Sequence, residues 1–182
     1  ECICLHNNSI KFLKSIETFF DFCYHNTIVR MTLGNKAQGG EIMAAIKAEH
    51  LNPFLLSAKQ VLQQVCNVDV TFGPITKDDF YVSGEPLFIM LGVTGEITGQ
   101  VCMVLGTETA KDVASRMMMG MPVETLDDMT SSALCELSNM IMGSTATLFS
   151  TQQMVMDITP PMSMQGSHIK LQTDVQALKI PM

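Results

Sequence analysis

The sequence predicts an α+β fold in which two or three helices pack on an antiparallel sheet. A helical pattern of apolar residues runs through 127–151, and apolar residues alternate on both sides of a glycine-rich turn between 87 and 105. The predicted elements follow the order helix, strands, helix, helix, strands, which is typical of such layered folds. The 182 residues, 47% of them hydrophobic, suffice for the core of one domain.

The chain is acidic, and its charge is unevenly distributed. The formal net charge is −7, and residues 1–42 contribute nothing to it, because four basic side chains there balance four acidic ones. Residues 43–182 therefore carry the whole excess. Because phosphate neutralisation by Lys and Arg supplies most nucleic-acid affinity, we expect no nucleic-acid partner and no anionic membrane surface.

The six cysteines are scattered, and none forms a Cys-x-x-Cys pair. Cys66, Cys102 and Cys135 lie in apolar patterns that predict buried thiols, which favours a reducing cytoplasm. Cys2-x-Cys4 with a nearby histidine has no second ligand cluster, so we expect no metal site and no cofactor of the chain's own.

Residues 1–42 differ from the rest of the chain. Charged residues interrupt the apolar run over 10–24, which excludes a membrane span and favours one amphipathic helix followed by a polar stretch over 32–40. We therefore treat 1–42 as an extra segment outside a domain of residues 43–182.

The first helix of that domain is predicted from Asn52 to about Cys66, because Asn is a good N-cap and Pro53 suits a first helical position. Glu49 stands three residues before Asn52, but the proline makes this Glu-x-x-Asn spacing a capping signal. His50 is expected at the boundary of an element, exposed to solvent.

Short strands are predicted over 68–72 and 81–82, and a hairpin over 87–105. Its turn falls in the segment 94–99, where either Gly95 or Gly99 can turn the chain. Thr107 is expected to cap a second helix that Gly120 ends. After the long helix over 127–151, a strand over 155–159 and one long or two short strands over 169–180 complete the fold.

The long helix carries the candidate functional residues. Its predicted core stripe consists of Leu134, Leu137, Ile141, Thr145 and Leu148. At 100° per residue, Glu136, Asn139 and Gly143 fall within about 60° of one another on the opposite face, where Ser132 also lies. A carboxylate and a carboxamide thus share one exposed face with small neighbours, although an ordinary solvated face gives the same spacing.

Several motifs, in this order, resemble the CheX family of chemotaxis phosphatases, which is related to CheC. They are Thr94–Gly95–Glu96–Ile97–Thr98–Gly99, Thr107–Glu108–Thr109–Ala110, Met117–Met118–Met119–Gly120, Glu136-x-x-Asn139 with Gly143, and Asp157–Ile158–Thr159–Pro160–Pro161. The resemblance covers roughly Met43 to Met182.

The resemblance implies an activity and a set of roles. The activity is hydrolysis of the phospho-aspartate on a CheY-like response regulator, which supplies its own Mg²⁺, by a cytoplasmic protein that is commonly a homodimer. Asn139 would orient the attacking water, and Glu136 would pair with a lysine of the regulator. Ser132, Met140 and Gly143 are the expected partner-binding residues around them.

Two points of the resemblance leave alternatives open. The family continues with a further strand beyond the position of Met182, so the sequence predicts an unpaired sheet edge there. A non-catalytic module of the same fold, such as a flagellar-switch or adaptor component, would bind the regulator without hydrolysing its phosphate. The presence of both Glu136 and Asn139 favours the enzyme.

Overall fold

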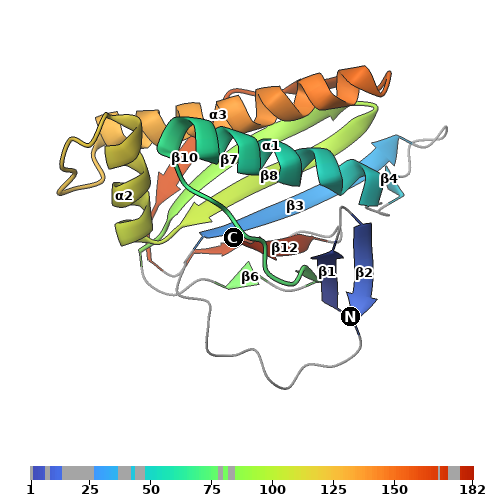
Figure 1. The fold of residues 1–182 in the computed structure, drawn as a ribbon, viewed down its shortest axis with the longest axis horizontal. Helices are drawn as coiled ribbons and strands as arrows, with labels where there is room; N and C mark the ends of the chain where they lie inside the picture. The colour runs from blue at the N-terminus through green and yellow to red at the C-terminus, as the bar shows by residue number, and fades with distance from the viewer. Residues whose placement is uncertain are drawn as a thin grey trace.

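The computed structural model describes residues 2–6, 9–13, 27–36, 42–43, 48–77, 80–81, 85–167, 169–171 and 177–182. Three helices lie on one side of an antiparallel sheet (Figure 1). The strand order is β10 (Met162–Gln165), β7 (Leu87–Gly95), β8 (Ile97–Leu105), β3 (Thr27–Lys36), β12 (Leu178–Pro181) and β5 (Thr76–Lys77). Two further strands pair with these: β4 (Ile42–Met43) with β3, and β9 (Met156–Ile158) with β7. The predicted α+β class is confirmed.

The predicted hairpin forms the structural centre of the sheet. Strands β7 (Leu87–Gly95) and β8 (Ile97–Leu105) pair antiparallel from Leu87 opposite Leu105 to Val93 opposite Gly99. This register places the turn at Gly95 and Glu96, and Gly95 has the positive φ of +114° that such a turn requires. Of the two candidate glycines, Gly95 therefore makes the turn.

Strand β3 (Thr27–Lys36) belongs to the segment that the sequence places outside the domain, yet it lies inside the sheet. It pairs with β8 over residues 27–35 and with β12 over residues 28–31. Met31 is buried in the main core. Residues 27–36 are thus an integral part of the sheet, contrary to the expected boundary at residue 42.

The rest of the N-terminal segment also departs from expectation where it is described. Strands β1 (Cys2–His6) and β2 (Ser9–Leu13) form a two-stranded pair, so the helix predicted over 10–24 does not begin as expected. Residues 14–24 of that predicted helix lie outside the described residues. Alternation at the start of this stretch, rather than helical spacing, was the relevant signal.

The C-terminal region contains two short strands, β11 (Lys170–Leu171) and β12 (Leu178–Pro181), as one of the two alternatives predicted. β11 pairs with β6 (Phe80–Tyr81), whereas β12 pairs with β3 on one side and β5 (Thr76–Lys77) on the other. Both edges of β12 are therefore paired, contrary to the expected unpaired edge. Strand β10 (Met162–Gln165) was not predicted.

Helix α1 (Ala48–Cys66) begins four residues earlier than the capping signal indicates. Leu51 is 1% exposed and His50 is 4% exposed, so this first turn packs onto the core. Burial of the turn overrides the preference of Asn and Pro for a helix start, because propensity is the weaker effect. Asn52 and Pro53 are consequently helical residues, and the prediction of a solvated His50 is wrong.

The strand predicted over 68–72 is absent from the ladders that the structure describes. Asn67 ends α1 with a positive φ of 51°, and the Val68 amide donates to the Leu62 carbonyl at 3.3 Å. Val70 is buried while Thr71 is exposed. The alternating pattern therefore reflects an extended chain lying over the core, and its first backbone contact with a described strand comes only at Gly73, whose amide donates to the Pro181 carbonyl at 2.9 Å.

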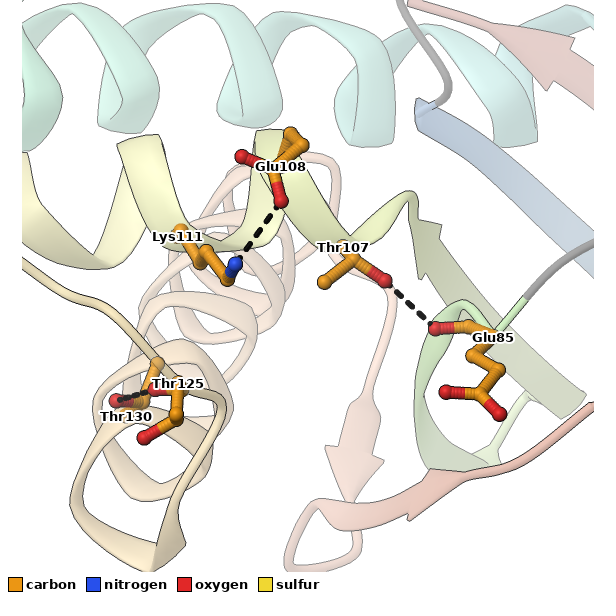
Figure 2. Close-up of polar contacts among 6 residues, drawn as sticks. All are labelled: Glu85, Thr107, Glu108, Lys111, Thr125 and Thr130. Atoms are coloured by element: carbon orange, nitrogen blue, oxygen red, sulfur yellow. Dashed lines mark hydrogen bonds and ion pairs between the residues drawn. The ribbon is translucent and has the colours of Figure 1, made fainter.

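Helix α2 (Thr107–Met117) starts beside the entry to the hairpin. Thr107 is its first residue and not its N-cap, which is Gly106. Figure 2 shows the Thr107 hydroxyl donating to the Glu85 carbonyl at 2.9 Å, and Lys111 paired with Glu108. The predicted stop is confirmed, because the amide of Gly120 (φ +84°) donates to the Ser115 carbonyl.

The main core lies between the helices and one face of the sheet. Its strand residues include Leu87, Ile89, Leu91, Val93, Val101 and Met103, and its helix residues include Phe54, Leu134, Leu137 and Phe149. A smaller buried cluster of Phe88, Cys102 and Val104 lies on the other face. Within the described residues, no helix has the combination of length and apolarity needed to cross a membrane.

Gly95 and Gly120, which both have a positive φ, give a matched test of this fold. A Cβ on Gly95 would lie 2.4 Å from the Val155 carbonyl oxygen, whereas a Cβ on Gly120 meets nothing within 4 Å. We expect Gly95→Ala to lower the free energy of unfolding by at least about 2 kcal/mol, from strain plus a backbone clash. Gly120→Ala should cost about 1 kcal/mol, from strain alone. Equal losses in urea unfolding would contradict this placement of the turn.

Candidate functional site

The candidate site lies on helix α3 (Asp128–Thr151), whose start is held by a network of hydrogen bonds. The Asp127 carboxylate accepts from the amide and the hydroxyl of Thr130 at 2.8 Å and 2.7 Å. The Thr130 hydroxyl is also within 3.3 Å of the Thr125 carbonyl, as Figure 2 shows. Asp127 is thus the N-cap, and the helix starts at Asp128, one residue after the predicted start.

The buried face of α3 determines the direction of its exposed face. Leu134, Leu137, Ile141 and Thr145 are buried as predicted, but the stripe ends on Phe149 and not on Leu148. The Phe149 ring packs edge-on against Phe54 of α1, with 5.6 Å between the ring centroids. Both residues suit the helical spacing, and the aromatic contact with α1 selects Phe149.

The C-terminal end of α3 is attached to the hairpin. The Glu96 carboxylate accepts from the Val155 amide at 3.0 Å, and the Glu96 amide donates to the Val155 carbonyl at the same distance. The Met154 amide also closes onto the Phe149 carbonyl. Both ends of the helix are therefore fixed. These contacts determine how far the helix is rotated about its own axis, and so which side of its middle turns faces outward.

The predicted site residues share the exposed side of this helix. Glu136 and Ser132 are exposed, Met140 is 38% exposed, and Asn139 and Gly143 are half-buried. The five residues span three turns, and the buried Leu137, Ser138 and Ile141 point to the other side. The structure thus brings them together on one surface, and it leaves their chemical roles as predictions.

Gly143 lowers the stability of α3, and no packing contact in the described structure requires a glycine there. A Cβ built on it meets no heavy atom within 4 Å beyond its own helix, and its φ is not positive. Glycine inside a helix is about 1 kcal/mol less favourable than alanine. Since no packing inside the chain requires the glycine, close approach of another molecule to the α3 backbone is a physical reason for it.

Cys135 adjoins Glu136 and is half-buried, whereas Cys66 and Cys102 are buried as predicted. Burial raises the pKa of the Cys135 thiol, and a side-chain hydrogen bond with Ser163 of β10 opposes this rise only in part. The thiol therefore stays protonated at neutral pH, and it is a poor nucleophile. The chemistry of this face rests on the carboxylate and the carboxamide.

The second Glu-x-x-Asn spacing lies inside a helix after all. Glu49 and Asn52 both belong to α1, so the reason given by the sequence for setting them aside is wrong. The residue four positions after the Asn gives a different reason. After Asn139 it is Gly143, whereas after Asn52 it is Leu56, whose side chain is 48% exposed. The bulky side chain prevents the close backbone approach that Gly143 allows.

The described part of the chain offers no group of three His, Cys, Asp or Glu side chains that could hold a metal ion. Sequence reasoning missed another exposed residue of the α3 face, Met129, which is 61% exposed in the first helical turn. Its position seven residues before Glu136 was the available signal, because residues two turns apart share a helix face.

Comparisons with known proteins agree with this architecture. Residues 87–182 match the family model described as chemotaxis phosphatase CheX. The chain is 30% identical over 134 residues to the CheY-P phosphatase CheX of Thermotoga maritima, which is 74% of this chain and 86% of that protein.

Solved structures show the same fold. A CheC-like superfamily protein from Shewanella sp. PV-4 superposes with a TM-score of 0.66 at 21% identity, covering 74% of this chain and 97% of that one. The CheX-CheY-BeF3-Mg²⁺ complex from Borrelia burgdorferi gives a TM-score of 0.58 at 24% identity, covering 72% and 94%.

The cap of α3 makes stability depend on pH. Hydrogen bonds from the Thr130 amide, and then from its hydroxyl, lower the pKa of Asp127 in the folded state. Its stabilising effect is therefore complete above the ordinary carboxyl pKa and is lost as the pH falls through the lowered folded pKa. Thermal melting between pH 2 and pH 7 should show a smaller acid-dependent loss for Asp127→Asn than for the parent protein.

Asp127→Ala serves as the second arm of this experiment. It removes both the titration and the acceptor, so its melting temperature should be lower than that of Asp127→Asn at neutral pH. An unchanged acid-dependent loss in both variants would show that Asp127 does not carry the effect.

Proposed function

Because the chain belongs to the CheX family of chemotaxis phosphatases, we propose that it accelerates hydrolysis of the phospho-aspartate on a CheY-type response regulator. The observation that carries this proposal is the pair Glu136 and Asn139 on one outward face of α3, whose buried side and both ends are fixed. A surface helix that carries a carboxylate and a carboxamide suits insertion into the shallow active site of another protein.

The reaction needs little from this chain. A water oxygen attacks the phosphorus, the bond to the aspartate oxygen breaks, and inorganic phosphate leaves a free carboxylate behind. The aspartate carboxylate is a good leaving group, which makes the acyl phosphate reactive, so placing the water in line can supply much of the rate enhancement. We expect the Mg²⁺ to belong to the regulator, and we propose no cofactor held by this chain.

Asn139 is the proposed catalytic residue. Its carboxamide oxygen can accept a hydrogen bond from the attacking water and hold it in line with the phosphorus. A carboxamide has no useful basicity, so positioning, and not general-base catalysis, is its role. Asn139 is half-buried, which restricts its side chain before the partner arrives.

Glu136 is the proposed anchor. It is exposed one turn before Met140, and it faces outward with Asp128 as the other acidic side chain of α3. The face is thus negative, which complements a lysine at the regulator's active site. Ser132 and Gly143 keep the surface low on either side, and Met140 supplies apolar contact.

Several properties of the whole protein follow the same proposal. We propose a cytoplasmic protein, since Cys66, Cys102 and Cys135 are free thiols, which is typical of a reducing compartment. We also propose a homodimer, with the exposed edge strand β10 as a surface that a second copy can cover. The domain would comprise β3 together with residues 43–182.

The two proposed roles can be separated by kinetics. We expect Asn139→Ala to lower kcat for the decay of a phosphorylated CheY-type regulator by about 100-fold or more, because the water loses its alignment. Glu136→Lys should chiefly raise KM, since it places like charges together. Both variants should keep the parent melting temperature, because both side chains point outward.

The outcomes distinguish the competing functions. If the parent protein binds a regulator loaded with beryllofluoride but does not accelerate phosphate loss from any regulator tried, the non-catalytic adaptor is correct. If Asn139→Ala accelerates decay as well as the parent does, Asn139 has no part in the mechanism.

Gly143 offers a test in which stability and activity move in opposite directions. Gly143→Ala should raise the free energy of unfolding by about 1 kcal/mol, because alanine is the better helix former. It should also raise KM, because the added methyl group holds the regulator away from the α3 backbone. Ser144→Ala on the same turn is the control, and an unchanged KM for Gly143→Ala would refute the close approach.

A further inference from the structure

The first turn of α3 exposes an apolar side chain where the fold does not need one. Met129 is 61% exposed, while the next residue, Thr130, is buried at 2% and hydrogen-bonded to Asp127. The turn is therefore held by Asp127 and Thr130, and the Met129 side chain contributes little to the core. A single exposed apolar side chain is ordinary on a protein surface, so the position of Met129 relative to the proposed site decides whether it has a function.

Helical geometry places Met129 on the same stripe as the proposed site. Seven residues separate it from Glu136 and eleven from Met140, which correspond to rotations of only about 20° in opposite directions. Along the helix axis, Met129 lies about 10.5 Å before Glu136, and Met140 lies about 6 Å after it. Two exposed methionines thus flank the proposed anchor on one line.

We propose that Met129 is an apolar anchor for the phosphorylated response regulator, so that the docking surface of α3 extends from Met129 to Gly143. This inference rests on the proposed function and adds a contact to it. The surface is continuous with the Glu136 and Asn139 face, and its length is about 21 Å. Its ionisable groups, Asp128 and Glu136, are both acidic, which fits the same partner surface that Glu136 requires.

The arrangement has a physical purpose at an interface. Apolar side chains on both sides of an ion pair exclude water when the partner docks, and exclusion of water strengthens the charge interaction between them. Methionine is flexible and polarizable, so it can adapt to the regulator's surface without an accurate fit. Asp127 holds the backbone of the turn in place, so Met129 is presented before docking.

The test uses the full chain and a CheY-type regulator loaded with beryllofluoride and Mg²⁺, with binding followed by fluorescence anisotropy. Met129→Gln should weaken this binding by about 5- to 30-fold. In a separate assay of phosphate release from the phosphorylated regulator, the same variant should raise KM by the same factor and leave kcat unchanged. Met129→Leu should restore binding to within about threefold. Val155→Gln, at a side chain 63% exposed just beyond the far end of α3, is the matched control and should leave both constants unchanged.

Each outcome decides the inference. Binding by Met129→Gln equal to that of the parent would overturn it, as would an equal loss in Val155→Gln. Loss in Met129→Gln with recovery in Met129→Leu supports it, provided that the melting temperatures agree. Because anisotropy needs no turnover, a chain that binds in this Met129-dependent way but does not hydrolyse would refute the proposed phosphatase activity and leave the anchor intact.

Discussion

The rotation of α3 about its own axis is the constraint on which the candidate site depends. A residue 100° further along a helix points elsewhere, so a change of one position in the buried stripe would turn Glu136 toward the sheet. The Phe54–Phe149 contact and the Asp127 cap act at opposite ends of the helix. Between them, the buried leucines leave only one side of α3 for water.

The elements that the sequence predicted well are those whose signals are local. The start of α3 near residue 127, its helical period and the β7–β8 hairpin are all specified by residues within a few positions of the structure that they form. The same locality explains the prediction of Glu136 and Asn139 on one exposed face, since only their spacing was needed. Their chemical roles depend on the partner, and those remain proposals.

The wrong predictions concern segments whose structure is determined by residues far away in the sequence. Asn52 and Pro53 suit a helix start, but burial of Leu51 extends α1 backwards. Residues 68–72 alternate like a strand and lie over the core without a ladder. Strand β3 was missed because its partners, β8 and β12, are far away in sequence, and because its second half was interpreted as part of a polar stretch over 32–40.

The position of β3 has a consequence for how the protein is made. Met31 pairs with Leu178, 147 residues later, although β3 is the first strand of the large sheet to leave the ribosome. β8 can pair with β3 as soon as it has been made, but β12 cannot join β3 until residues 178–181 have been synthesised. Until then the other edge of β3 stays open, and such long-range pairing slows folding and exposes aggregation-prone edges.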